Sequence, residues 1–145
     1  MDGYIQYKIL PELDLIIEYY SGKINLDDII GHKKLEIKDS EYSANYNFIA
    51  DLRDSELDVI RQDIIDYLDF VEMNNKVSGQ RKSAILTNTP NHAAITTLFR
   101  MNSKNLPINF EIFTTLEAAI DWINLSSNYY DNIEESIRNM KNNTV

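Results

Sequence analysis

Apolar and polar positions change their period along the chain, and these changes predict alternating strands and helices. In residues 4–10 and 13–20, apolar side chains recur at every second position on either side of a break at Pro11. This alternation is typical of an antiparallel hairpin. Residues 26–37 carry apolar side chains at three- and four-residue intervals behind Asn25, a good capping residue, and therefore predict a helix.

An apolar run in the middle of the chain predicts the central strand of the fold. Residues 46–52 are mostly apolar, and the segment ends abruptly in the charged residues Asp51, Arg53 and Asp54. Such a run is typical of a strand that is buried on both faces of a largely parallel sheet. Open α/β sheets place their binding crevices at the carboxyl ends of such strands. We therefore expect the charged residues to lie at a binding edge.

The rest of the chain continues to alternate between helical and strand patterns. A polar loop at residues 55–58 precedes a helix over 59–74 and a strand over 83–86. The next helix begins after Thr89 and Pro90, and its apolar stripe consists of Ala94, Ile95, Leu98 and Met101. A strand over 108–113, a helix capped by Thr114 with Glu117 three residues later, and an amphipathic segment over 127–140 follow. These starts follow the known preferences for helix caps and for proline in the first turn.

The element order predicts an α/β fold with one mixed, mostly parallel, five-stranded sheet and helices packed on it. The order is β-β-α-β-α-β-α-β-α with an added C-terminal helix, since strand–helix–strand units favour right-handed parallel crossovers. We assign residues 1–125 to the domain and residues 126–145 to a C-terminal helical extension. This extension either covers the domain's own sheet or docks on another subunit.

Composition narrows the classes of function. The 145 residues carry a formal net charge of −9, which argues against general nucleic-acid binding and leaves a basic partner as one alternative to ordinary surface acidity. There is no cysteine, and no apolar run is long enough to span a membrane. No secretory signal pattern is visible, so we expect a cytoplasmic location.

Metal and cofactor motifs are also missing from the sequence. The four acidic residues Asp63, Asp66, Asp69 and Glu72 recur along one helix and are expected to point into solvent, whereas a metal needs ligands that converge. Four glycines leave no dinucleotide-binding fingerprint. His32, beside Lys33 and Lys34, is expected to be solvated. We therefore expect no metal and no cofactor.

Three segments carry a resemblance to a known family: Phe48 to Asp54 (FIADLRD), Ser83 to Thr89 (SAILTNT) and Phe110 to Trp122 (FEIFTTLEAAIDW). Together with the element order over about residues 4–125, they resemble the STAS family of sulfate transporters and anti-sigma-factor antagonists. The resemblance is to the stand-alone bacterial branch related to sporulation antagonists. It implies a non-catalytic protein-binding or ligand-binding module.

The resemblance also implies a possible phosphorylation site. In anti-sigma-factor antagonists, a partner kinase phosphorylates a serine at the start of the helix after the third strand, and this switches binding. Residues 58–60, where that serine is expected, contain none. Ser55 is the nearest hydroxyl and our candidate, with a simple loop serine as the alternative. Asp54 and Glu56 on either side would oppose a second negative charge.

Polar residues after the third, fourth and fifth strands form the candidate partner or ligand surface. They are Asp51, Arg53, Asp54, Ser55, Thr87, Asn88, Thr89, His92 and Thr114. Helix N-termini at such an edge favour anions. The structural alternative is that Asn25, Thr89 and Thr114 only cap helices and that Asp51 and Arg53 form an ion pair.

Three functions remain open at this point. The first is a regulatory STAS-like module that binds a protein partner, with Ser55 as the site of phosphorylation and a homodimer as one form of partnership. The alternative is a carrier of a small molecule or lipid in an apolar pocket between sheet and helices. The third is an enzyme that uses His92, in the first turn of its helix, as a base with Asp51; otherwise His92 is a surface or capping residue. We favour a non-enzymatic role, since no nucleophile motif is present.

Overall fold

A single mixed sheet organises the computed structural model, which describes residues 2–143. Its strands lie in sequence order: β1 (Tyr4–Leu10), β2 (Leu15–Asn25), β3 (Asn47–Asp58), β4 (Arg81–Leu86) and β5 (Ile108–Phe113). β1 pairs with β2 antiparallel, and all other pairs are parallel. The fold class and the element order expected from the sequence are confirmed.

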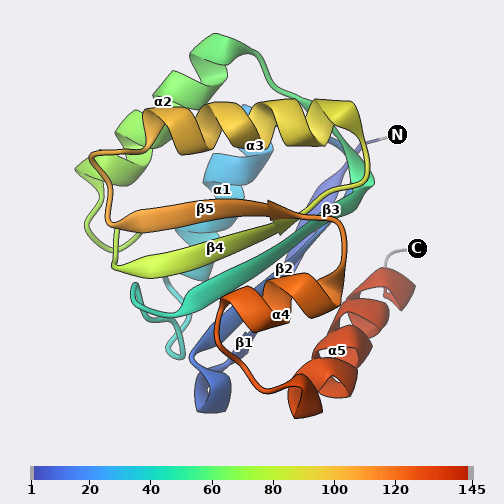
Figure 1. Cartoon of the computed structure of the whole chain (residues 1–145). Helices are drawn as coiled ribbons and strands as arrows, with labels where there is room; N and C mark the ends of the chain where they lie inside the picture. Colours follow the sequence, from blue (N-terminus) through green and yellow to red (C-terminus); the bar gives the residue numbers. More distant parts are fainter. Residues whose placement is uncertain (1, 144–145) are drawn as a thin grey trace.

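Helices cover both faces of the sheet (Figure 1). On one face lie α1 (Leu26–Glu36), α2 (Arg61–Met73) and α3 (Pro90–Asn102), and on the other lie α4 (Leu116–Trp122) and α5 (Tyr130–Asn142). Two short 3-10 turns, Pro11–Leu13 and Ser127–Tyr129, link β1 to β2 and precede α5. The C-terminal helix therefore packs on its own sheet. Residues 1, 144 and 145, which belong to the assigned ranges 1–125 and 126–145, lie outside the described residues. The division of the chain at residue 125 stays a prediction.

β3 is the middle strand, as predicted, with β2 on one side and β4 on the other. The interpretation of residues 55–58 as a loop is wrong, because β3 continues to Asp58. Ser55 pairs with Gly22 and Leu57 with Ile24, so the long β2 supplies ladder partners where β4 has ended. The alternation of exposed Asp54, Glu56 and Asp58 around buried Leu57 is the period of an edge strand.

Some helix details also differ from the expectation. Thr115, not Thr114, caps α4 by accepting a hydrogen bond from Ala118 N at 3.3 Å. Met101 lies at the end of α3 with 60% of its surface exposed, and Ala94 is exposed as well. Ile95 of the predicted stripe is buried as expected, and the other buried residues of α3 are His92 and Thr96. By contrast, Asn25 caps α1 in a reciprocal capping box with Asp28, which places the start of α1 as predicted.

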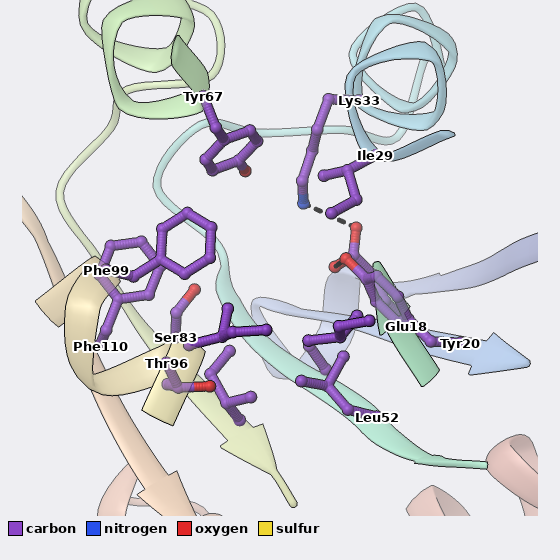
Figure 2. A pocket seen from close by; sticks show the side chains of 14 residues that line it. Glu18, Tyr20, Ile29, Lys33, Leu52, Tyr67, Ser83, Thr96, Phe99 and Phe110 are labelled. Carbon is purple, nitrogen blue, oxygen red and sulfur yellow. Dashed lines mark hydrogen bonds and ion pairs between the residues drawn. The ribbon is translucent and has the colours of Figure 1, made fainter. Parts of the chain in front are cut away.

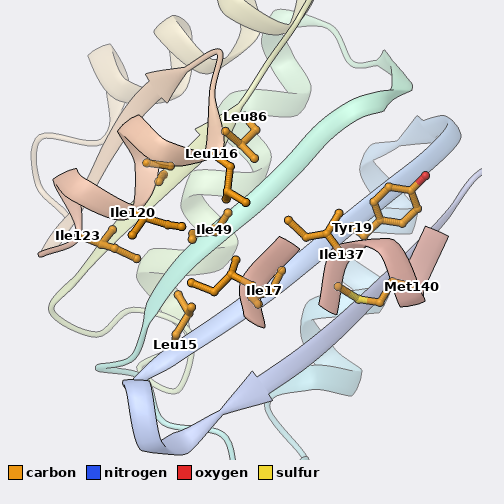
Figure 3. Close-up of a cluster of buried hydrophobic side chains, with 13 residues drawn as sticks. Leu15, Ile17, Tyr19, Ile49, Leu86, Leu116, Ile120, Ile123, Ile137 and Met140 are labelled. Carbon is orange, nitrogen blue, oxygen red and sulfur yellow. The ribbon is translucent and has the colours of Figure 1, made fainter. Parts of the chain in front are cut away.

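The two faces of the sheet bury different sets of side chains. The α4–α5 face is an apolar core in which residues of β2, β3 and β4 meet α4 and α5 (Figure 3). Ile17 and Ile49 are fully buried there, and Ile133 of α5 packs against them. The opposite face is also largely apolar, but Glu18 of β2 points into it between Ile17 and Tyr19, which face the other way.

Candidate functional site

The nine predicted surface residues lie along the carboxyl-terminal edge of β3, β4 and β5. Asp51, only 2% exposed, accepts hydrogen bonds from Arg53 Nε at 2.9 Å and from Arg53 Nη2 at 2.9 Å. It also accepts from Arg53 N at 3.0 Å. The bidentate arrangement fixes the guanidinium in one orientation, half exposed at the edge.

Two further residues of this set join β3 to the start of α3. Asn88 Nδ2 donates to the Arg53 carbonyl at 3.1 Å, and His92 Nε2 lies 2.8 Å from the Ser55 carbonyl oxygen. His92 Nδ1 accepts from Asn88 N at 3.5 Å. Both ring nitrogens are thus engaged with the backbone, and the ring is 1% exposed. The expectation of a surface histidine is wrong because the extension of β3 covers this ring.

The three threonines of the set differ in exposure and in role. Thr89 caps α3 by accepting from His92 N at 3.1 Å. Thr87 is buried, and its N–H donates to the Phe113 carbonyl at 2.8 Å. Thr114 is exposed and, with Arg53 and the capping Thr115, lines a surface hollow of about 320 Å³. The structural roles named as the alternative are therefore present: Thr89 caps α3, and Asp51 and Arg53 form an ion pair.

Asp54 and Ser55 lie where β3 leaves the sheet centre. The Tyr19 hydroxyl donates to Asp54 Oδ2 at 2.5 Å, and Lys141 Nζ lies 3.4 Å from the same oxygen. Burial, reinforced by the bond to Asp54, raises the pKa of Tyr19. Ser55 is half buried, and its Oγ donates to the Leu52 carbonyl at 2.8 Å. Tyr19 and Lys141 were not among the predicted residues of this edge.

A second polar group is buried beneath α1, on the other side of the sheet from Asp51. Lys33 Nζ lies 2.7 Å from Glu18 Oε2 and 3.6 Å from Glu36 Oε1. His32 Nε2 lies 2.9 Å from Glu36 Oε2 and 3.3 Å from Glu18 Oε2. All four residues are buried, so the expectation that His32 is solvated is wrong. We call Glu18, His32, Lys33 and Glu36 the charge cluster.

Each carboxylate of the charge cluster faces two bases, and the pKa values reflect this. Burial would raise the pKa of Glu18, but Lys33 and His32 outweigh it and hold the pKa well below its usual range. Burial lowers the pKa of His32, but hydrogen bonds to Glu18 and Glu36 raise it to about 9. Burial, with the nearby Glu18 charge, raises the pKa of Glu36 to about 7. The cluster therefore holds compensating charges near neutral pH.

Three members of the charge cluster also have the donor atoms that a metal would use. Oxygens of Glu18 and Glu36 and a nitrogen of His32 all lie within 4.8 Å of one another. Within residues 2–143, Glu36 Oε1 is the buried side-chain oxygen without a hydrogen-bond partner. However, the ammonium of Lys33 already neutralises Glu18 at contact distance. A metal ion would have to displace that ammonium and the His32 proton, so this donor set fits a metal poorly.

A cavity of about 80 Å³ adjoins the charge cluster between the sheet and α1, α2 and α3 (Figure 2). Its lining residues are Glu18, Tyr20, Ile29, Lys33, Ala50, Leu52, Leu57, Tyr67, Ser83, Ile85, Ile95, Thr96, Phe99 and Phe110. Lys33 and Glu18 form one end, and the rings of Phe99 and Phe110 stand at the other. We call this space the sheet–helix cavity.

Three hydroxyl groups line the sheet–helix cavity without a hydrogen-bond partner among residues 2–143. They belong to Ser83 of β4, Thr96 of α3 and Tyr67 of α2, and all three residues are at least nine-tenths buried. Figure 2 shows the Ser83 and Thr96 oxygens pointing into the space between the aromatic rings and Leu52. Unlike Glu36 Oε1, these oxygens are not fully enclosed by protein atoms and instead face the space of the cavity. They therefore mark a place where a polar partner fits.

The sequence held a signal for this region that our interpretation did not use. Glu18 is a lone acid inside the apolar run Leu15 to Tyr20, and a buried carboxylate requires a cationic partner. His32 and Glu36 are four residues apart on a predicted helix and therefore share one face. The cavity itself left no signal, since its hydroxyls come from three elements far apart in the chain.

Comparison with known proteins identifies the fold. No protein-family model matches the chain, and no curated protein matches it. A crystal structure of an uncharacterised DUF3478-family protein with a SpoIIAA-like fold, from Shewanella loihica PV-4, superimposes with a TM-score of 0.59 at 16% identity. The match covers 85% of this chain and 96% of that one. The chain therefore has a SpoIIAA-like fold. No helix within residues 2–143 is both long and apolar enough to cross a membrane.

Proposed function

We propose that this STAS-like domain is a non-catalytic binding module whose ligand is a small molecule held in the sheet–helix cavity. The observation that carries the proposal is the set of unpartnered hydroxyls that Ser83, Thr96 and Tyr67, all buried residues, present to one partly open cavity. A concave, mostly apolar space with a few converging polar groups is the usual form of a small-molecule site. The catalytic alternative is weaker, because both His92 ring nitrogens are bound to the backbone.

The position of the cavity suits a module that reports on its ligand. The lining residues come from the sheet and from three helices, so a bound molecule would contact β2, α1, α2 and α3 together. A ligand that binds only the folded protein raises its stability by mass action. Ligand binding would therefore tighten this whole face of the domain.

Native mass spectrometry of gently purified protein, with a cavity-filling variant, tests the proposal. The Thr96→Leu variant places a larger apolar side chain into the cavity, while Thr97→Leu alters the neighbouring residue, whose hydroxyl bonds to the Ala93 carbonyl outside it. We expect a bound small molecule in the wild type and in Thr97→Leu, and its loss in Thr96→Leu. Wild-type protein that is always free of ligand, and whose thermal stability no compound raises, would contradict the proposal.

A second candidate function, the docking of a protein partner, is favoured by the edge formed by Arg53, Asn88 and Thr114. These side chains reach the surface beside the hollow of about 320 Å³. Cross-linking and affinity capture with wild type, Arg53→Ala and the remote variant Lys104→Ala would test it. A partner whose capture requires Arg53 and not Lys104 supports docking here, and one that is indifferent to Arg53 argues against it.

Phosphorylation at Ser55 belongs to this second candidate. A phosphate there would replace the hydrogen bond to the Leu52 carbonyl and would lie between Asp54 and Glu56. Like-charge repulsion would loosen the outer end of β3 and the contact with His92. Phosphopeptide mapping after incubation with source lysate, with Ser55→Ala as the control, tests whether the residue is modified. A stoichiometric phosphate at another residue, with none at Ser55, would contradict the assignment of Ser55 as the phosphorylation site.

A further inference from the structure

We infer that the ligand of the sheet–helix cavity is a small, uncharged molecule with a carbonyl, amide or hydroxyl group, which Ser83 and Thr96 bind by hydrogen bonds. This inference rests on the proposed small-molecule function and adds the chemistry of the ligand. It excludes two other classes, ions and plain hydrocarbons. Size, charge and hydrogen bonding each support it separately.

The volume of the cavity limits the size of the ligand. The cavity is partly open and has a volume of about 80 Å³. An apolar cavity of roughly 150 Å³ is enough for benzene, so the present space suits a molecule smaller than a benzene ring. A lipid chain or a nucleotide would require the helices to separate from the sheet. Compounds with about four non-hydrogen atoms are therefore the right probes.

The charge cluster disfavours a charged ligand. Lys33 lies at contact distance from Glu18, and His32 lies between Glu18 and Glu36, so two acids already face two bases. An additional ion in this buried space would have no counter-charge left, and an uncompensated buried charge is strongly unfavourable. A carboxylate would be repelled by Glu18, and a cation would be repelled by Lys33. Neutral molecules avoid both costs.

The unpartnered hydroxyls disfavour a plain hydrocarbon. Ser83 and Thr96 point into the cavity in Figure 2, and each hydroxyl both donates and accepts. A hydrocarbon would displace water from them and leave them unpaired, which loses the full cost of their desolvation. An amide or a hydroxyl can accept from one and donate to the other. Lys33 has spare donors as well, since its Nζ donates one hydrogen bond, to Glu18 Oε2 at 2.7 Å.

Three isosteric probes separate these classes: acetamide is neutral, acetate is an anion and acetamidinium is a cation. We would titrate each into the full-length protein and follow the backbone amide resonances of β4 and α3 by NMR, with xenon as the apolar probe. We expect acetamide to bind at least about tenfold more tightly than either ion, since one hydrogen bond or charge mismatch is worth that factor. Xenon should bind more weakly when acetamide is present.

Three variants assign the binding to the hydroxyls. Thr96→Val and Ser83→Ala each remove one unpartnered hydroxyl, and each should weaken acetamide binding by about five- to tenfold. Thr97→Val removes a hydroxyl that bonds within α3 and should leave acetamide binding unchanged. If Thr96→Val does not fold, Ser83→Ala still decides the question. Unchanged acetamide binding in Ser83→Ala would overturn the inference.

The outcomes also distinguish this inference from the proposed function. Tighter binding of acetate or acetamidinium would overturn the neutral class and leave the cavity as a ligand site. If xenon binds and acetamide does not, the ligand is not a hydrogen-bonding molecule, but the cavity remains a ligand site. If neither xenon nor acetamide perturbs β4 and α3, the cavity holds water only, and both the inference and the proposed function fail.

Discussion

The two faces of the sheet are built from the same strands and yet are filled in opposite ways. The α4–α5 face is closed by side chains such as Leu15, Ile17 and Ile133, which are fully buried, and its buried charge is the Asp51–Arg53 ion pair near the edge. The α1–α3 face buries the charge cluster, three unpartnered hydroxyls and a cavity. The first face therefore gains its stability chiefly from hydrocarbon burial, while the second retains a larger set of buried polar groups that oppose it.

This difference indicates which face is shaped by something other than stability. A buried ion pair is often no better for stability than well-packed apolar residues of the same volume. Unpaired hydroxyls lower stability further. Departures from good packing and full pairing are expected at functional sites. The contrast therefore directs attention to the α1–α3 face, and each prediction below tests the contrast.

The largest effect should follow from removing the central cation of the charge cluster. In Lys33→Met, Glu18 loses its partner at 2.7 Å, and two carboxylates remain buried with His32 alone. Breaking a buried pair in this way costs about 3–5 kcal/mol of the free energy of unfolding. Urea denaturation measures it. The exposed neighbour Lys34→Met is the control and should change stability by less than about 0.5 kcal/mol. A loss below 1 kcal/mol in Lys33→Met would mean that the cluster is hydrated.

On the opposite face, the largest single change should come from a cavity in the apolar core. Ile133 of α5 is fully buried against the sheet, so Ile133→Ala should cost about 2–4 kcal/mol. The exposed Asn132→Ala serves as the control in the same denaturation experiment. If Ile133→Ala hardly changed the free energy of unfolding, α5 would not be part of the folded core. The description of the α4–α5 face as a well-packed core would then be wrong.

Stability should depend on pH because of the α1–α3 face. The pKa of His32 is raised to about 9 from 6.5, so its contribution is fully present below pH 6.5 and is lost as pH rises through 9. The pKa of Glu36 is raised from 4.5 to about 7, so its contribution to stability is likewise lost as pH rises from 4.5 through 7. Glu18 has a lowered pKa, so its contribution is lost as the medium becomes acidic. The free energy of unfolding should therefore be greatest in mildly acidic solution.

The size and origin of this pH effect can be separated by substitution. Between pH 6.5 and 9, His32 should account for a fall on the order of 2–3 kcal/mol. Thermal or urea unfolding across that range measures it, and His32→Gln should flatten the dependence. A His32→Gln variant with the wild-type slope would show that Glu36 or another group carries the effect. The groups that face His32 are Glu18, Glu36 and the ring of Tyr7.

The fold was predictable because its signals are local. The apolar run at residues 46–52, the alternation before and after Pro11, and the caps Asn25 and Thr89 each depend on a few neighbouring residues. They indicated the order of strands and helices along the chain, the central position of β3 and the starts of α1 and α3. The outer end of β3 was missed because its partner, the second half of β2, is more than 30 residues away.

The candidate site was predictable only in part, for a related physical reason. The edge residues follow from the rule that parallel strands end at one edge of a sheet. The structure brings Asn88 to the Arg53 carbonyl and His92 to the Ser55 carbonyl, although β3 itself continues to Asp58. The charge cluster depends on whether α1 buries the face that carries His32. The neighbouring Lys33 and Lys34 led to the wrong prediction that this face is solvated. The sheet–helix cavity depends on side-chain packing, which no local pattern describes.

The smallest effect is the most direct test of the difference between the faces. Thr96→Val replaces a buried hydroxyl without a partner by a methyl group of similar size, so in the absence of ligand the protein should gain about 0.5–1 kcal/mol. The same exchange at Thr97, whose hydroxyl bonds to the Ala93 carbonyl, should change stability by no more than about 0.5 kcal/mol in either direction. A gain at Thr96 alone means that the wild type keeps this hydroxyl at the expense of stability, as a ligand contact would require. A loss at Thr96 means that the hydroxyl is already satisfied by ordered water, and the polar face then needs no ligand to account for it.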